Sequence, residues 1–229
     1  RTAVRSRSPK TTSATGSACR PRRRVPIPSA NDQPVVIGLA ASPRRGGNSE
    51  TTLDWFLEGA ERAGAHIEKI ILSALDVSPC RGCTTCQATG ECVIQDDFQS
   101  VRDRLLRVDV ITLASPVYFW NVPAQAKAFI DRHQSLWAGQ EAARPGTPWT
   151  PRSQDPLGVL LGVAADPAAQ FESLRQTVDS LLRAYGAQFW DALFVRQVFE
   201  KEAVRSRQDV RKAAHALGRR AVQGAGVVR

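Results

Sequence analysis

The sequence predicts a doubly wound α/β fold, in which a five-stranded parallel sheet of strand order 2-1-3-4-5 carries helices on both faces. Short continuous apolar runs have the length and composition of strands that are buried on both faces. These runs alternate along the chain with longer segments whose apolar residues recur at helical spacing. Hydrophobic residues make up 42% of the 229 residues, which is enough for a substantial core.

The first half of the chain contains three of the predicted strands. The run Val35–Ala40 is apolar throughout, as a parallel strand covered on both faces must be. The turn-rich stretch after it ends in Asn48 and Ser49, and either residue can cap a helix that begins near Glu50. The expected elements, in order, are a strand at 35–40, a helix from about 50, a strand at 66–72, a loop at 76–95, a helix capped by Asp96 or Asp97, and a strand at 108–114.

Prolines mark element boundaries in the second half. Pro123 suits the first turn of a helix, because the N–H that proline lacks has no intrahelical partner there. The stretch 139–155 is polar and contains Pro145, Pro148 and Pro151, so we expect a surface loop or lid. The expected elements are a helix at 123–136, this loop, a strand at 157–163, a helix at 168–184, a strand at 187–195 and a helix at 204–222.

Basic residues concentrate at the N-terminal end. Residues 1–33 carry +7 of the formal net charge of +9, so the rest of the chain is close to neutral. This tail is rich in Ser, Thr and Pro and has too few large apolar residues to fold, so we expect 1–33 to be disordered and 34–229 to form the domain. The run 20–24 is compatible with binding to nucleic acid or another acidic surface, with a transit peptide, or with an extension that has no role. The lack of interleaved aromatic residues favours the last of these, and we expect no nucleic-acid partner.

Other classes of protein are disfavoured by what the sequence lacks. No apolar run approaches the length of a membrane span, and no signal-peptide core precedes the domain. We therefore expect a cytoplasmic protein without a membrane partner. The chain contains no methionine, so we do not expect Arg1 to be its initiator. The three histidines, at 66, 133 and 215, are not paired with a nucleophile motif, and we expect structural roles for them.

A polar loop follows the first strand, at the point where a doubly wound sheet binds its ligands. It lacks the glycine spacing of a dinucleotide turn and the Gly-Lys-Ser/Thr end of a nucleoside triphosphate loop. It offers hydroxyls, an amide, two guanidinium groups and glycines at a helix N-terminus, which suits a phosphate monoester such as that of FMN. The alternative is a surface turn without a ligand. The candidate phosphate contacts are Ser42, Arg44, Arg45, Asn48 and Ser49.

An aromatic loop follows the third strand, and the predicted strand order brings it beside the polar loop. A flat apolar isoalloxazine ring needs aromatic walls and backbone hydrogen-bond partners, both of which this loop supplies. The alternatives are a hydrophobic plug or a dimer contact. Two complementary loops at one position favour an FMN site over either alternative. The candidate ring contacts are Pro116, Val117, Tyr118, Phe119, Trp120 and Asn121.

Four cysteines lie between the second predicted strand and the next helix. Cys80, Cys83, Cys86 and Cys92 have the spacing Cys-x2-Cys-x2-Cys-x5-Cys, which allows the thiols to converge on one soft metal centre. A [4Fe–4S] cluster, a closed zinc site and a thiol or disulfide centre without metal are all compatible with it. The fifth cysteine, Cys19, stands alone in the tail.

These motifs resemble a known family. Residues 38–49, GLAASPRRGGNS, resemble the FMN-phosphate loop of the NADPH-dependent FMN reductase family, which has the flavodoxin-like fold. Residues 115–123 and 127–132 resemble that family's flavin-ring segment and following helix. The cysteine motif together with Asp96 and Asp97 is similar to that of the iron–sulfur flavoproteins, a branch of the family. The resemblance spans about 34–222, although the 139–155 stretch is longer and richer in proline than expected.

The resemblance implies non-covalent FMN, a homodimer or dimer of dimers, and electrons from NAD(P)H or a ferredoxin-like donor. We therefore expect an FMN-dependent NAD(P)H oxidoreductase that passes electrons to a quinone, flavin, nitroaromatic or similar acceptor. Because the cofactor carries this chemistry, no side-chain acid or base is obligatory and we predict no catalytic residue. The alternative is an iron–sulfur electron carrier supplied by a ferredoxin-like partner. A third and weaker hypothesis is a binding protein directed by its basic tail.

Overall fold

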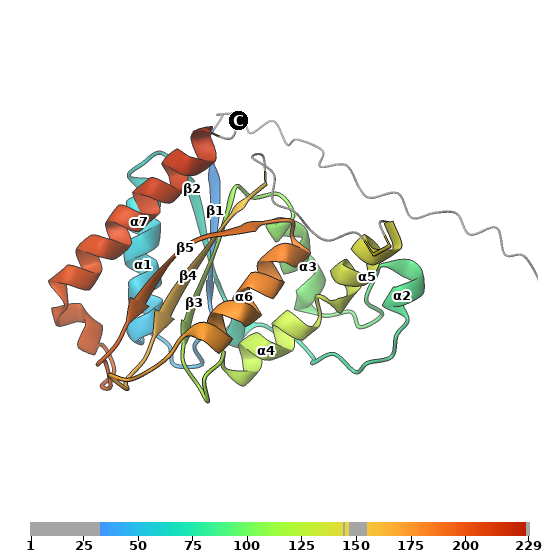
Figure 1. Ribbon diagram of the computed structural model, residues 1–229, viewed down its shortest axis with the longest axis horizontal. Helices are drawn as coiled ribbons and strands as arrows, with labels where there is room; N and C mark the ends of the chain where they lie inside the picture. The colour runs from blue at the N-terminus through green and yellow to red at the C-terminus, as the bar shows by residue number, and fades with distance from the viewer. Residues whose placement is uncertain (1–32, 144, 147–154, 228–229) are drawn as a thin grey trace, which may run out of the picture.

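The computed structural model describes residues 33–143, 145–146 and 155–227. One parallel sheet has the strand order β2-β1-β3-β4-β5, with helices on both faces (Figure 1). The predicted fold class and strand order are confirmed, whereas the predicted disordered tail lies outside the described residues except for Gln33. The strands are β1 (Val35–Ala40), β2 (His66–Ile71), β3 (Val110–Pro116), β4 (Leu157–Val163) and β5 (Gln188–Val195).

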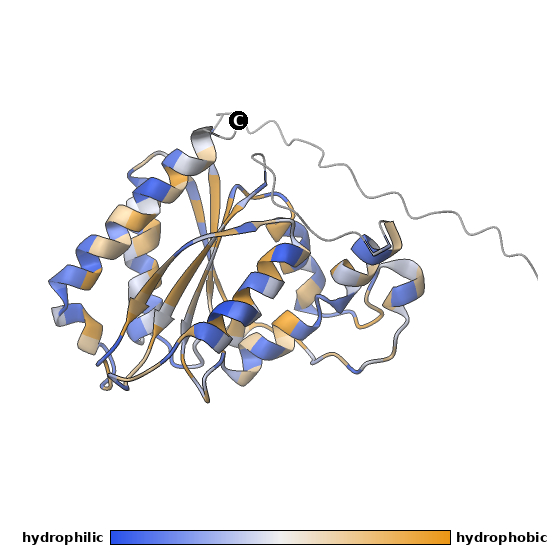
Figure 2. Cartoon of the chain, in the orientation of Figure 1, coloured by the Kyte–Doolittle hydropathy of each residue, from blue (hydrophilic) through white to orange (hydrophobic). Residues whose placement is uncertain are grey.

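Helices cover the two faces of the sheet unequally. Helices α1 (Asn48–Glu61) and α7 (Gln208–Val227) pack on one face, and α3 (Asp97–Leu105), α4 (Ala124–Asp131) and α6 (Glu172–Ala184) pack on the other. Figure 2 shows apolar strands at the centre and hydrophilic stretches along the outer faces of the helices. The core therefore consists of two apolar layers, one on each side of the sheet.

Close packing of α1 against α7 depends on two glycines. A Cβ atom on Gly59 would collide with the backbone of His215, and a Cβ atom on Gly218 would collide with the backbone of Phe56. Each helix thus uses a glycine to let the other approach, and this pair forms one wall of the domain.

Two helices form a lobe beside the sheet, and two short 3₁₀ turns complete the described elements. Helix α2 (Cys86–Thr89) contacts α5 (Gln134–Ala143), and both lie to one side of the strands (Figure 1). The 3₁₀ turns η1 (Leu72–Ala74) and η2 (Ala203–Ser206) follow β2 and precede α7. No helix in the described ranges has both the length and the apolar character of a membrane span.

The structure corrects several predicted boundaries. The helix expected at 123–136 is two helices, α4 and α5, separated at Arg132 and His133, whose side chains are both buried. Helical periodicity cannot anticipate a break made by buried polar residues. The expected loop 139–155 begins as helix as far as Ala143, and most of the remainder lies outside the described ranges. Smaller shifts are that β2 ends at 71, β3 begins at 110, α6 begins at 172, β5 begins at 188 and α7 runs from 208 to 227 after η2.

Candidate functional site

The polar loop between β1 and α1 presents an uncapped helix N-terminus. Ser42 shapes the turn, because its Oγ accepts the Arg44 N–H at 3.0 Å. Gly46 has the left-handed φ of +64°, which glycine adopts at no steric cost. The N-cap of α1 is Gly47, not Asn48 or Ser49 as predicted, and no side chain caps the helix. The first backbone N–H groups of α1 are therefore available to an anion, as a phosphate site requires.

Glu50 stabilises this loop from within the first turn of α1. Its buried carboxylate accepts the Gly46 N–H at 2.8 Å, lies 3.1 Å from Lys69 Nζ and contacts Arg45 Nε at 3.4 Å. Burial opposes its ionisation, but the bonds from Gly46 and Lys69 outweigh burial and hold the pKa of Glu50 below its ordinary value. The role of Glu50 and Lys69 in shaping this loop was not predicted. The only signal in the sequence is that Glu50 is an acidic residue in the first turn of α1.

The predicted phosphate contacts divide into exposed and internal groups. Arg44 and Arg45 are exposed, whereas Ser42 and Ser49 are buried. The amide of Asn48 is engaged elsewhere, because it bonds to the backbone of the segment after β5. A contact between Asn48 and a phosphate would therefore use its backbone N–H. The partners of the Asn48 side chain are the carbonyls of Val198 and Glu200 and the N–H of Val204, at 3.2, 2.8 and 3.1 Å.

The aromatic loop is a tight turn with strained backbone. Tyr118 and Asn121 exchange two backbone hydrogen bonds, of 2.8 and 2.9 Å, across the turn. Between them, Phe119 and Trp120 have φ angles of +46° and +66°, a region that bulky residues rarely occupy. This conformation leaves Phe119 fully exposed and Trp120 half exposed. The turn thus presents two aromatic side chains to solvent at the end of β3.

The two loops lie side by side, as the predicted strand order requires. The Ala41 N–H donates to Ala114 O at 2.9 Å, so β1 and β3 end at the same edge of the sheet. The aromatic loop is anchored further along the edge, where the Val117 N–H donates to Val163 O at 2.9 Å. The Asn121 side chain also donates to Thr177 Oγ1 on α6, at 2.9 Å. A ligand at this edge would have the polar loop on one side and the aromatic turn on the other.

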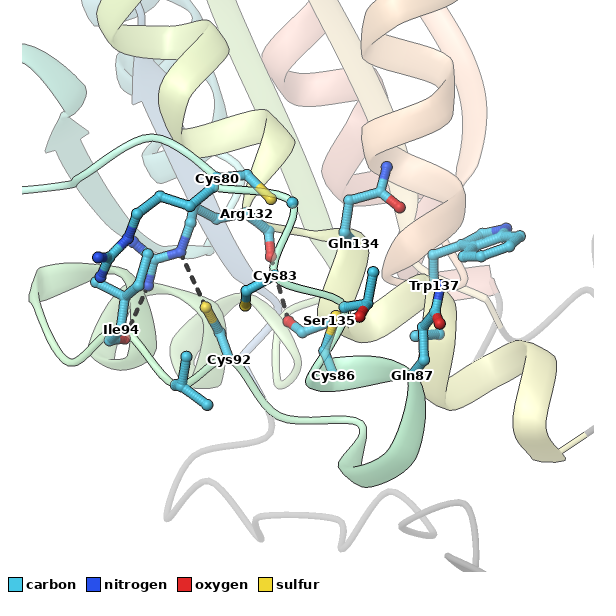
Figure 3. Close-up of a pocket in the computed structure, with 15 residues that line it drawn as sticks. Cys80, Cys83, Cys86, Gln87, Cys92, Ile94, Arg132, Gln134, Ser135 and Trp137 are labelled. Carbon is cyan, nitrogen blue, oxygen red and sulfur yellow. Dashed lines mark hydrogen bonds between the residues drawn. The ribbon is translucent and has the colours of Figure 1, made fainter. Parts of the chain in front are cut away.

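All four predicted cysteine ligands line one cavity, which lies in the side lobe and not between the two loops. The cavity has a volume of about 200 Å³, and Trp137 and Arg132 also line it (Figure 3). The thiols of the four clustered cysteines are free. Cys80 and Cys83 are exposed, whereas Cys86 and Cys92 are half-buried.

The ionisation of two of these thiols is perturbed in opposite directions. Burial raises the pKa of Cys86, and the charges of the other three thiols add to this effect. Hydrogen bonds from the backbone and side chain of Thr85 lower the pKa of Cys83. The ionisation of Cys86 is therefore coupled to that of the other three cysteines.

The donor set around this cavity consists of four thiols. Within the described ranges, no three His, Cys, Asp or Glu side chains converge as one metal ion requires. Four thiols lining one cavity of about 200 Å³ are nevertheless the number and kind of ligands that a [4Fe–4S] cluster takes. The residues present therefore fit such a group, with each thiol as one ligand.

Arg132 occupies the wall of this cavity and has the largest fully buried side chain in the described structure. Its Nε donates to Cys92 Sγ at 3.2 Å, and its Nη1 lies 2.7 Å from Asp96 Oδ2. Burial opposes the ionisation of Asp96, but Arg132 and two backbone N–H groups outweigh burial and lower the pKa of Asp96. From the sequence, Arg132 was noted only as the last residue of the 127–132 segment. Its contacts could not be predicted, because its partners are distant along the chain.

Two of the three histidines bond within the fold. His133 is buried, and its Nε2 lies 2.5 Å from Tyr185 Oη. His215 bonds to Glu58 across the α1–α7 interface, at 2.9 Å. Lys127 and Asp131, one turn apart on α4, form an ion pair at 2.7 Å.

Fold and site together define a flavodoxin-like flavoprotein. The profile of the NADPH-dependent FMN reductase family matches residues 34–192, and the chain belongs to this family. An iron–sulfur flavoprotein of Archaeoglobus fulgidus is 44% identical over 97 residues, which are 42% of this chain and 44% of that protein. One from Methanosarcina thermophila is 37% identical over 97 residues, which are 42% of this chain and 51% of that protein. These relatives support the predicted branch, and the chain spans about half the length of each.

Solved structures share the fold at low sequence identity. A flavone reductase superposes with a TM-score of 0.61 at 19% identity, covering 83% of this chain and 62% of that one. An NAD(P)H:quinone oxidoreductase from Methanothermobacter marburgensis superposes with a TM-score of 0.57 at 19% identity, covering 83% of this chain and 95% of that one. At such identities the likeness concerns the fold alone.

Proposed function

We propose that this protein is an FMN-dependent oxidoreductase that takes electrons from NAD(P)H and passes them to a small acceptor. A quinone, a free flavin, a nitroaromatic compound or a similar molecule fits this role. The observation that carries the proposal is the meeting of two loops at the carboxyl ends of β1 and β3. One presents an uncapped helix N-terminus and the other presents exposed aromatic side chains. Membership of the FMN reductase family supports the same assignment.

Each loop has a separate task in this proposal. The N–H groups at the start of α1, with Arg44 and Arg45 beside them, hold the FMN phosphate. Glu50 fixes the turn in the shape that exposes those N–H groups. Tyr118 and Trp120 flank the ring, which lies against the end of β3. The bound flavin supplies the hydride chemistry, and the protein orients it and limits the access of water.

A homodimer or dimer of dimers agrees with the exposed aromatic residues. Phe119 is fully exposed and Trp120 is half exposed, and side chains of this kind are enriched in protein interfaces. We propose that a second copy of the chain covers part of the aromatic turn and completes the mouth of the flavin site.

The phosphate assignment is tested with a matched pair of variants on one helix. Arg44 is exposed next to the N-terminus of α1, and Arg62 is exposed at its C-terminal end. We expect Arg44→Gln to weaken FMN binding on the order of tenfold, the equivalent of about 1.4 kcal/mol. Arg62→Gln should leave FMN affinity unchanged. Both proteins should bind riboflavin, which lacks the phosphate, with wild-type affinity, as measured by quenching of flavin fluorescence.

Two outcomes would contradict this assignment. Equal FMN affinity in the Arg44→Gln and wild-type proteins would remove Arg44 from the phosphate site. An equal loss of affinity for FMN and riboflavin would show that the substitution acts on the ring or on the fold.

The second candidate function is an iron–sulfur electron carrier that receives electrons from a ferredoxin-like partner. It is supported by the four cysteines that line one cavity and by the names of the relatives. Steady-state oxidation of NAD(P)H separates the two candidates, because an enzyme turns over with a small acceptor whereas a carrier shows almost no turnover. Rapid turnover with a quinone would exclude the carrier as the main function.

A further inference from the structure

We propose that Arg132 is a positioning residue that clamps both ends of the cysteine loop, residues 76–95, and holds the sulfur of Cys92 in place before any metal is bound. Arg132 lies at the break between α4 and α5, and its side chain is completely buried. The part of this inference that concerns a cluster rests on the proposed iron–sulfur site, whereas the part that concerns the loop does not.

The clamp joins the start of the cysteine loop to its end. Arg132 Nη1 donates to the carbonyl of Ser78, just before the first cysteine, at 2.9 Å. Its Nη2 donates to the carbonyl of Ile94, just after the last cysteine, also at 2.9 Å. A guanidinium group is a rigid planar fork, so these two bonds fix the loop ends relative to each other. Dashed lines in Figure 3 link this side chain to Ile94 and to the thiol of Cys92.

The buried charge of Arg132 is balanced within the same contact. Asp96 Oδ2 lies 2.7 Å from Nη1, and the Asp96 side chain is almost completely buried. Asp96 also forms a capping box with Gln99 at the start of α3. The ring of Phe98 packs against the guanidinium, whose carbon lies 4.7 Å from the ring centroid. The clamp is therefore attached to a helix of the main domain, so the loop is held against a rigid element.

The remaining contact of the guanidinium reaches a thiol. Nε donates to Cys92 Sγ at 3.2 Å, and Cys92 is separated from Cys86 by five residues, the longest interval in the motif. Cys80 and Cys83 are exposed and flank Gly82, whose φ is +63°. Cys92 is thus the thiol that the buried guanidinium holds in place. Hydrogen bonds and positive charge next to cluster sulfurs favour the more negative, reduced state, so Arg132 raises the reduction potential of a bound cluster.

Arg102 provides a matched control. It is also a buried arginine, and it also bonds to the cysteine loop, since Nη1 lies 2.5 Å from Glu91 Oε2. Its side chain bonds to the carboxylates of Glu91 and Asp103 and not to a cysteine thiol. Arg102→Gln therefore removes a buried guanidinium without removing the clamp.

The loop is tested first, in the full-length protein without metal. We expect Arg132→Gln to increase backbone hydrogen exchange at both loop ends, near Ser78 and Ile94, on the order of tenfold or more, since each end loses its bond to the clamp. Arg102→Gln should leave exchange near Ser78 unchanged. Wild-type exchange at both ends in Arg132→Gln would overturn the proposal. If Arg132→Gln fails to fold, the double variant Arg132→Met, Asp96→Asn removes both charges and keeps a side chain that caps α3.

The cluster is tested second, by anaerobic reconstitution of the full-length protein with iron and sulfide. We expect Arg132→Gln to retain less iron and sulfide than the wild type and to have a more negative midpoint potential. Arg132→Lys keeps the charge and should recover part of the potential shift, and Arg102→Gln should stay close to the wild type. Wild-type iron content and potential in Arg132→Gln would overturn this role. If the wild type itself takes up no iron and sulfide, the iron–sulfur function fails, and the exchange measurement alone decides the role of Arg132.

Discussion

Arg132 and His133 are adjacent and both buried, yet their surroundings favour opposite ionisation states. Arg132 faces a carboxylate, a thiol and two carbonyls, so its charge is fully compensated. His133 faces the rings of Phe98 and Phe129, backbone carbonyls and the hydroxyl of Tyr185. Burial lowers the pKa of His133 to about 4, and the nearby arginines add to the effect although the carbonyl bonds oppose it. His133 is therefore neutral near neutral pH.

This lowered pKa predicts that stability falls as the solution becomes mildly acidic. Between the ordinary value of 6.5 and about 4, the unfolded chain binds a proton at His133 that the folded chain does not bind. The free energy of unfolding should therefore decrease as the pH is lowered, by about 2 kcal/mol from neutrality to about pH 5. Urea unfolding at both pH values measures the difference.

His133→Gln is the control, because glutamine can bond to Tyr185 and does not titrate. We expect the loss of stability between neutrality and about pH 5 to be much smaller in this variant. Carboxylates that stabilise the fold lose their contribution mainly below about pH 4.5, so they contribute little in this window. An equal pH dependence in both proteins would contradict the buried, neutral state of His133.

At the scale of elements, the aromatic turn is the clearest case of local strain at a proposed binding site. Two non-glycine residues with positive φ, Phe119 and Trp120, form a turn that Asn-Gly would form with less strain. Phe119 is fully exposed and contributes no burial to compensate for the strain. We infer that the turn keeps these side chains for binding and not for stability.

The double variant Phe119→Asn, Trp120→Gly tests this inference, because the two properties should change in opposite directions. We expect the free energy of unfolding to rise by about 1 kcal/mol as the strain is relieved. We expect FMN affinity to fall on the order of tenfold as the aromatic wall is lost. Thermal or urea unfolding and flavin fluorescence measure the two effects.

Phe199 supplies a matched control, since it is exposed but lies outside both loops. Phe199→Asn should change neither FMN affinity nor, by more than a few tenths of a kcal/mol, the stability. If the aromatic turn variant is less stable than the wild type, the turn does not destabilise the native fold through backbone strain. If it retains wild-type FMN affinity, the turn is not part of the flavin site.

The elements themselves were predictable to different degrees. The strands were found because buried parallel strands are apolar along their whole length, and β1 and β4 have the predicted bounds. Asp96, one of the two predicted caps, is the N-cap of α3, and such a side chain acts on its own helix. The break between α4 and α5 was missed, because it depends on the contacts of Arg132 with residues far along the chain. The cap of α3 was thus readable from its own sequence, whereas the break between α4 and α5 was not.

For the whole molecule, the strand order explains why the flavin loops could be predicted as a pair. In the order β2-β1-β3-β4-β5, the first and third strands are neighbours, so the loops after them must meet. The sequence also indicated that the cysteines form one group. It could not reveal that their cavity lies in a side lobe walled by α5, or that Glu50 and Arg132 organise the two centres. Those roles arise from pairs that only the folded chain brings together.

We propose that one molecule of FMN binds at the edge formed by β1 and β3 and accepts hydride from NAD(P)H. The most direct test is the visible spectrum of the purified, FMN-saturated protein, recorded anaerobically before and after addition of NADPH or NADH. We predict bands of a protein-bound flavin that disappear on addition of one of the two nucleotides and return when a quinone is added. A protein that binds no flavin, or whose flavin bands persist with both nucleotides, would not be an FMN-dependent NAD(P)H oxidoreductase.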